Sequence, residues 1–113
     1  MTTVDYTKQQ LIDIVAESRT QAHEAAVNHI AKHGEDWYCG FAWINILGVK
    51  GNTKLGKMLK EAGVKQDYTK TFQIWNPSGH STQSMLVKEA GAEAAAQVFR
   101  KYGFNASTGS RAD

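Results

Sequence analysis

The fold of this chain is decided by the stretch TFQIWNPSGHSTQSMLVKEAGAEAAAQVFRKY, residues 71–102. Residues 71–75 alternate apolar and polar side chains, so they predict a short β-strand. A polar loop that begins at Asn76 leads into a helix from about Ser84 to Tyr102, whose small apolar residues recur at helical spacing. A helix N-terminus presents free N–H groups and a partial positive charge, so a hydroxyl-rich loop that leads into it predicts an anion site.

The composition bounds the class of protein. The chain has 113 residues, 42% of them hydrophobic and 21% charged, with one proline and one cysteine. These values predict a single domain, residues 1–113, with one hydrophobic core. No apolar run approaches the length of a membrane span, and the first residues lack the pattern of a signal peptide. We therefore expect no contact with membranes. Because a lone cysteine forms no internal disulfide, we also expect a cytoplasmic protein.

Positive charge gathers in the middle of the chain. Residues 41–70 hold six lysines against two acidic residues, a net charge of +4, whereas residues 1–40 carry −3. Such lysines could meet the phosphates of a nucleic acid. The segment lacks arginine and interleaved aromatic residues, so we favour a solvated helix face and its flanking loops over a nucleic-acid site.

Residues 5–34 predict one long helix. Thr7 and Gln10 match a capping box, and Gly34 supplies a left-handed stop. The residues expected on its buried face recur three and four apart: Leu11, Ile14, Val15, Ser18, Ala22, Ala25, Ala26 and His29. Some 27 residues at about 1.5 Å each make a rod of about 40 Å. That length is large for so small a domain, so we expect part of this face to pack on a partner chain.

Residues 35–113 predict a βαβαβ unit. Residues 37–47 are aromatic and β-branched and predict a central strand, with a short helix after it that ends near Ala62. Residues 104–107 predict a short third strand before a polar tail, residues 108–113. The expected fold is α/β in the order α-β-α-β-α-β, with three helices packed on a mostly three-stranded sheet.

The expected strand–helix–strand steps are long enough for right-handed crossovers. The connector over residues 64–70 leaves open an additional edge strand. A three-stranded sheet leaves its aromatic face short of helices, so we expect a homo-oligomer that covers this face.

Two groups of residues are candidates for ligand binding. The loop and helix start, residues 76–84, suit phosphate, carboxylate or ribose groups, with His80 as a titratable helper; alternatively its hydroxyls only cap the helix and fill the turn. If the two aromatic strands align, Trp43 and Trp75 form a patch that stacks a planar base; alternatively they belong to the core or to a subunit interface. The full candidate set is Trp43, Asn45, Gln73, Trp75, Asn76, Ser78, His80, Ser81, Thr82, Gln83, Ser84 and, as a charge clamp, Arg111.

Metal binding and catalysis have weaker support. His29 and His33 are spaced to share a metal, and Cys39 follows, but neither a Cys-x-x-Cys pair nor a second histidine pair is present. Cys39 with a histidine, or Ser81 beside His80, could serve as nucleophile and base, but no orienting acid accompanies either. We expect no metal, no cofactor and no catalytic residue.

Several short stretches carry a resemblance to a known group of proteins. They are WYCGFAW at 37–43, WNPSG at 75–79, Gln83-Ser84, KEAGA at 88–92 and the final GSRAD at 109–113. Together they resemble small accessory proteins encoded by tailed bacteriophages, over about the C-terminal two-thirds of the chain. The resemblance implies a bacterial host cytosol and a role such as host takeover or defence evasion. It transfers no activity and no catalytic residues.

Three functions follow as hypotheses. The first is a non-enzymatic phage accessory protein that sequesters a phosphate-bearing small molecule, a signalling nucleotide in the leading case. The second is a protein–protein inhibitor of a host or defence enzyme, which docks through the aromatic face or the long helix. The third is an accessory protein that binds nucleic acid through the lysines of residues 50–70.

Overall fold

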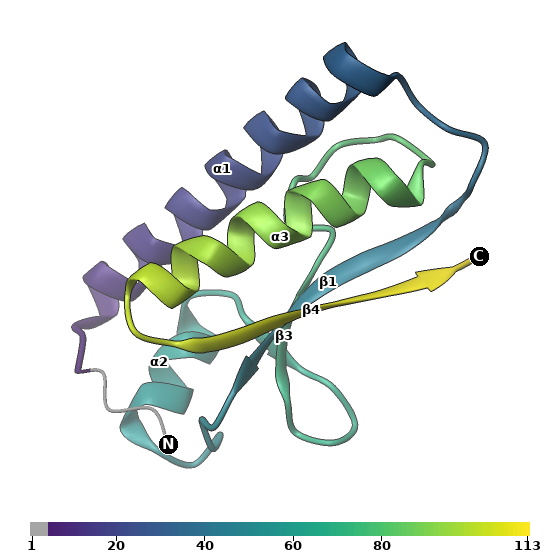
Figure 1. Cartoon of the computed structure of the whole chain (residues 1–113). Helices are drawn as coiled ribbons and strands as arrows, with labels where there is room; N and C mark the ends of the chain where they lie inside the picture. Colours follow the sequence, from purple (N-terminus) through teal and green to yellow (C-terminus); the bar gives the residue numbers. More distant parts are fainter. Residues whose placement is uncertain (1–4) are drawn as a thin grey trace.

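The computed structural model describes residues 5–113, which form three helices and four strands (Figure 1). The elements follow in the order α1 (Lys8–His33), β1 (Gly40–Leu47), α2 (Lys54–Glu61), β2 (Lys65–Gln66), β3 (Phe72–Trp75), α3 (Met85–Lys101) and β4 (Asn105–Ala112). The fold is α/β, and the three predicted helices are present. Within residues 5–113, no helix is both long and apolar enough to cross a bilayer.

The sheet differs from the predicted one. It has four strands in the order β2-β3-β1-β4, and all neighbouring strands are antiparallel. The sheet has one strand more than the mostly three-stranded sheet that was predicted, because the edge strand that residues 64–70 left open is present as β2. A turn over residues 67–70, closed by a 3.0 Å hydrogen bond from Lys70 N to Asp67 O, reverses the chain and places β3 between β2 and β1. From β1 onward, element order and strand order are those of a split β-α-β arrangement.

The end of the chain is a strand, and the expected polar tail over residues 108–113 is wrong. β4 pairs with the whole of β1, from Gly40 opposite Ala112 to Leu47 opposite Asn105. Serine and glycine are poor strand formers, which is why the sequence pattern stops the strand too early. At the edge of a sheet, main-chain hydrogen bonds to the inner strand hold such a segment without apolar side chains.

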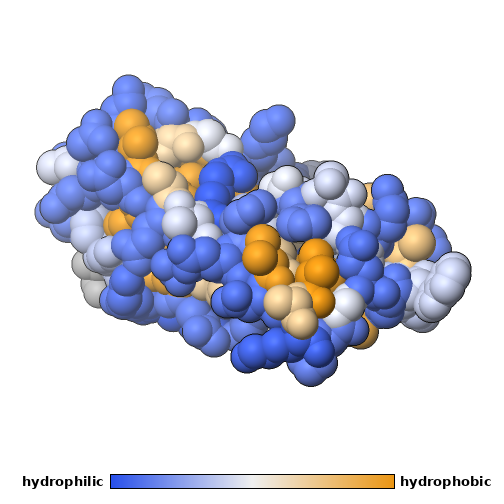
Figure 2. Space-filling model, turned by 90° about the horizontal axis from the view of Figure 1, so that it is seen from above, coloured by the Kyte–Doolittle hydropathy of each residue, from blue (hydrophilic) through white to orange (hydrophobic). Residues whose placement is uncertain are grey.

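The first helix agrees with its prediction. Thr7 Oγ1 accepts a hydrogen bond from Gln10 N at 3.2 Å, and Gln10 Oε1 accepts one from Thr7 N at 2.9 Å, which completes the capping box. Helix α1 lies beside α3 and antiparallel to it (Figure 1). The molecule measures 42 × 26 × 20 Å, and α1 contacts α3 and α2 of its own chain. Packing of part of α1 on a partner chain stays a prediction. Seen from the side of α1, the surface is mostly hydrophilic, and hydrophobic residues gather in separate patches (Figure 2).

Helix α3 is buried over a wider arc than the single predicted stripe. The spacing of its apolar residues predicts a buried stripe of Val87, Ala90, Gly91, Ala94, Ala95, Val98 and Tyr102. Of these, Ala90, Ala94 and Tyr102 are only partly buried, whereas Ala92, Ala96 and Phe99 are buried in addition. The reason is that α3 contacts α1 on one side and the strands β1 and β4 on the other. A Cβ on Gly91 would lie 2.9 Å from Ser78 Cβ, so glycine is what permits this close packing.

The two faces of the sheet are different. On β1, Ala42, Ile44 and Ile46 are buried in a core that also takes in Leu59 of α2. The alternate residues Phe41, Trp43 and Asn45 are only partly buried. We call this second side the open face and define it by its residues on the three long strands: Phe41, Trp43, Asn45, Gln73, Trp75, Ser107, Gly109 and Arg111.

Candidate functional site

The strand register brings two predicted groups together on the open face. Trp43 lies opposite Trp75, and Asn45 lies opposite Gln73. The alignment of β1 with β3, which the sequence left conditional, is therefore present. On the other side of β1, Ser107 lies opposite Asn45, and Gly109 lies opposite Trp43. The result is two parallel rows across the strands. One row is Trp75, Trp43 and Gly109, and the other, which we call the polar row, is Gln73, Asn45 and Ser107.

The indole rings of Trp43 and Trp75 stack on each other. Their centroids are 4.5 Å apart with an interplanar angle of 18°. Trp43 also lies against the main chain of β4, because a Cβ on Gly109 would be within 2.6 Å of three indole atoms. Trp75 is 47% exposed, and the Phe41 ring lies beside it at 6.1 Å. Trp75 therefore presents the larger solvent-accessible aromatic surface of this pair.

The polar row is a continuous chain of hydrogen bonds. Trp75 Nε1–H donates to Gln73 Oε1 at 3.0 Å, and Gln73 Nε2 donates to Asn45 Oδ1 at 2.8 Å. Asn45 Nδ2 in turn donates to Ser107 Oγ at 3.4 Å. Each side-chain amide carries two N–H donors and uses one of them in this chain of bonds. The network therefore fixes the orientation of both amides and leaves each with a donor for a ligand.

Two cations flank Phe41. Arg111, predicted as a charge clamp, lies opposite Phe41 on β4, with its guanidinium carbon 5.6 Å from the ring centroid. Lys88 reaches the same ring from α3, with Nζ at 5.2 Å from the centroid, and donates to Gly40 O at 2.8 Å. One end of the aromatic surface thus carries positive charge that suits a phosphate.

The predicted loop, residues 76–84, is tied together by its own side chains. Ser78 Oγ donates to Asn76 Oδ1 at 3.1 Å and accepts from His80 N at 3.2 Å. Thr82 N donates to His80 Nδ1, and Ser84 N donates to Thr82 Oγ1, both at 3.1 Å. Asn76, Ser78, Thr82 and Ser84 are partly or fully buried. Much of the polar capacity of the loop is therefore used to hold its shape.

A carboxylate already lies at the start of α3. Ser84 Oγ caps the helix by accepting from Val87 N at 3.3 Å, and it donates to Asp36 Oδ1. Met85 N, also in the first turn, donates to Tyr38 O at 2.8 Å. Ser81 and Gln83 are exposed, but they border a hollow that Glu35 and Asp36 also line. An incoming anion would meet negative charge there, so the open face suits a phosphate better than the loop does.

Sequence reasoning missed five contributors: Phe41, Lys65, Lys88, Ser107 and Gly109. Phe41 was placed on the aromatic face but not in the site, and Ser107 and Gly109 were assigned to the end of a short strand and to a tail. Lys65 pairs with Gln73 across β2 and β3, so it extends the polar row to the sheet edge. Extending the alternation of residues 105–107 as far as 111 would have placed Ser107, Gly109 and Arg111 on one face.

The other candidate chemistry gains no support from the geometry. The rings of His29 and His33 are 4.9 Å apart, but no group of three or more metal-ligating side chains occurs within residues 5–113. Cys39 is exposed, and its thiol lies 3.7 Å from Trp37 O. His80 directs Nδ1 at the main chain of its own loop.

The chain matches no protein-family model, and neither the curated proteins nor the solved structures contain a match to it. The relation to tailed-bacteriophage accessory proteins therefore stays a prediction from the sequence stretches that carry it.

Proposed function

We propose that the protein is a non-enzymatic binding protein that captures a nucleotide on the open face. The observation that carries this proposal is the half-exposed indole stack beside an ordered row of amides. A planar base would stack on Trp75, and such stacking contributes about 1–3 kcal/mol per base. Gln73 and Asn45, whose amides are already oriented, would hydrogen-bond the edge of the base.

The phosphate is assigned to Arg111. Its guanidinium carbon lies 5.6 Å from the centroid of the Phe41 ring, and that ring lies 6.1 Å from the ring of Trp75. Phe41 therefore links the cation to the indole on which the base would stack. The arginine fork offers paired donors to phosphate oxygens. The loop over residues 76–84 would then support the site by placing Trp75 rather than by contacting the phosphate.

The biological role that suits such a site is sequestration. A small protein that holds a nucleotide without converting it lowers the free concentration of that nucleotide in the host cytosol. This agrees with the accessory role that the bacteriophage resemblance implies. A homo-oligomer remains a prediction, and it would fit this function only if it leaves Trp75 accessible.

Intrinsic tryptophan fluorescence tests the proposal directly. Trp37 is 99% exposed and lies off the open face, so the variant Trp37→Phe leaves a signal that comes only from Trp43 and Trp75. We expect nucleoside monophosphates to quench this signal, and Trp75→Ala to weaken binding by at least about tenfold. Trp37→Ala, a matched loss of an exposed indole, should leave affinity unchanged. If millimolar nucleotides neither quench the signal nor raise Tm, the proposal is wrong.

A second function has an observation of its own. Trp37 and Tyr38 are 99% and 57% exposed at the entry to β1, and exposed aromatic residues are common anchors of protein interfaces. This arrangement favours the inhibitor hypothesis, with a host protein docked at the start of β1. A stoichiometric partner that binds the wild-type chain and the Trp75→Ala variant, but not Trp37→Ala/Tyr38→Ala, would favour it over nucleotide capture.

A further inference from the structure

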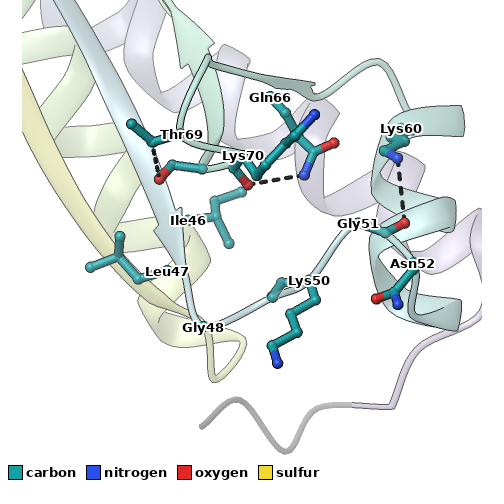
Figure 3. A pocket seen from close by; sticks show the side chains of 12 residues that line it. Ile46, Leu47, Gly48, Lys50, Gly51, Asn52, Lys60, Gln66, Thr69 and Lys70 are labelled. Carbon is teal, nitrogen blue, oxygen red and sulfur yellow. Dashed lines mark hydrogen bonds between the residues drawn. The ribbon is translucent and has the colours of Figure 1, made fainter.

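A second positively charged site lies at the opposite end of β1. An open pocket of about 590 Å³ is bordered by the end of β1, residues 48–52, one residue of α2, one of β2 and residues 69–71. Lys50, Lys60 and Lys70 line it from three separate segments (Figure 3). We call this site the lysine pocket. Among the described residues that line it, none is an aspartate or a glutamate.

The acidic side chains closest in sequence are Asp67 and Glu61, and each has partners of its own. The Asp67 carboxylate accepts hydrogen bonds from Thr69 N, Thr69 Oγ1 and Thr71 N at 2.6–3.0 Å, and the Thr69 hydroxyl is the main cause of its lowered pKa. Glu61 pairs with Lys8 at 3.3 Å. Lys60 Nζ donates to Gly51 O at 3.3 Å, which uses one of its three protons. Because Thr69 and Thr71 line the pocket, the negative charge of Asp67 lies beside it, and the three lysines outnumber that single charge. The lysine pocket therefore keeps a net positive charge that suits an anion.

The pocket and the proposed nucleotide site lie along the same strand. Phe41, beneath Arg111, and Leu47, at the pocket, are six residues apart on β1, a distance of about 20 Å. Between them lie the two indoles and the polar row, which Lys65 extends toward the sheet edge. Leu47 and Thr71, which line the pocket, follow the alternation of the open face, whereas Ile46 and Gln66 belong to the opposite side of the sheet. The lysine pocket therefore lies at the end of the sheet, where the open face stops. Cations thus lie at the Arg111 end of the open face and just beyond its other end, with aromatic rings between them.

We propose that the natural ligand of the open face is a single-stranded nucleic acid, whose chain runs along β1 from Arg111 to the lysine pocket. This inference rests on the proposed function and extends it from one nucleotide to several. One nucleotide is too short to contact both ends of the face, whereas a strand sets its bases on aromatic rings and its phosphates on flanking cations. Four-stranded sheets with aromatics on the two central strands stack two or three bases of RNA in this way.

Binding of oligonucleotides of increasing length tests the inference. Titrations of the Trp37→Phe protein would use thymidine monophosphate, the thymidine dinucleotide and the thymidine octanucleotide, which are DNA. An octauridylate, an RNA of eight nucleotides, would be titrated beside them. We expect the octanucleotide to bind at least about tenfold more tightly than the mononucleotide. The octauridylate arm shows whether RNA or DNA is preferred, and tighter binding of either octamer supports the inference.

Charge removal in the pocket provides the second test. Lys70 has a φ of 69°, which asparagine adopts more easily than lysine, so Lys70→Asn removes a charge without straining the backbone. We expect Lys60→Gln/Lys70→Asn to weaken octanucleotide binding and to reduce its salt slope by about 0.7 per lost contact. Binding of the mononucleotide should not change. Lys54→Gln/Lys57→Gln removes the same charge from the exposed side of α2, outside the pocket, and should have a smaller effect.

The two proposals fail in different ways. If the octanucleotide binds no more tightly than the mononucleotide, or if the pocket variant behaves like the α2 control, the inference about the strand is wrong. Quenching by the mononucleotide that depends on Trp75 would then leave the proposed function intact. Octanucleotide binding that is unaffected by Trp75→Ala would overturn the inference about the strand, and mononucleotide binding that is unaffected by Trp75→Ala would overturn the proposed function.

Discussion

The indole of Trp43 lies directly against the main chain of Gly109, where an added Cβ would be 2.5 Å from Trp43 Cε2. This contact joins β1 to the edge strand β4 on the open face. It also fixes the plane of the indole on which Trp75 stacks. A glycine in an edge strand, which weakens the strand intrinsically, is here what allows the aromatic stack to lie flat on the sheet.

We expect Gly109→Ala to displace Trp43 and to destabilise the protein. The new methyl group would occupy space held by the indole, and overpacking of this kind costs about 1–3 kcal/mol. Thermal unfolding and near-UV circular dichroism would report the lower stability and the disturbed indole pair. Thr108→Ala, at the neighbouring exposed position of β4, is the control. Equal Tm values for the two variants would show that Trp43 moves aside at no cost.

The hydrogen bond between Asn45 and Gln73 should appear as a coupling energy. Both side chains are partly buried and belong to one network, so Asn45→Ala and Gln73→Ala are expected to be non-additive by about 0.5–1.5 kcal/mol. A double-mutant cycle in urea measures this directly. Purely additive effects would mean that solvent replaces the bond, and the orientation of the amides would then lose its role in base recognition.

The sequence predicts most accurately where local signals and burial agree. The capping box at Thr7, the caps at Thr53 and Ser84, and the alternation of Phe72 and Ile74 with their neighbours each encode their own element. Helix α1 was well predicted, because its apolar period and its caps act over a few residues. The stacking of Trp75 on Trp43 was anticipated for a similar reason. Successive residues of a strand point to opposite faces, so the sequence shows which residues of each strand share a face.

The misses share a physical cause, which is pairing between distant strands. Strand β2 has two residues, and β4 has few apolar ones, so neither carries a pattern of its own. They are strands because β3 and β1 offer main-chain partners. The same applies to the loop over residues 76–84, whose hydroxyls suggest a ligand site. Asp36, far away in the sequence, occupies the helix start instead, and local composition cannot reveal such a contact.

Loss of the Ser84 cap should destabilise α3. Ser84 is buried, accepts from Val87 N and donates to Asp36, so Ser84→Ala removes a cap and leaves a carboxylate without its donor. We expect a loss of about 1–2 kcal/mol in the free energy of unfolding. Thr7→Ala removes an exposed cap from α1 and should cost less. Chemical denaturation of both variants checks the order, and an equal cost would indicate that Asp36 contributes nothing.

The contact between α1 and the end of α3 should make stability depend on pH through Glu17. The Glu17 carboxylate accepts from Lys101 Nζ and, at 2.6 Å, from Tyr102 Oη. These bonds lower the pKa of Glu17 below its ordinary 4.5, and they raise the pKa of Lys101 above 10.5 and that of Tyr102 above 10.0. The lowered carboxyl pKa gives stability that is present above about pH 4.5 and is lost as pH falls through the folded value. The two raised pKa values give stability that is present below about pH 10 and is lost as pH rises through their folded values.

The variant Glu17→Gln should therefore lower Tm most at neutral pH. There Glu17 is ionised while Lys101 and Tyr102 keep their protons, and this combination of protonation states favours the folded protein. The difference from wild type should shrink in acid, where Glu17 is protonated, and in alkali, where Lys101 and Tyr102 lose their protons. Because these groups lie near the surface, added salt should reduce the neutral-pH difference as well. Glu24→Gln changes the net charge equally from an exposed position on α1 and is the control. A Tm difference that stays constant from acid to alkaline pH would mean that Glu17 acts through packing alone.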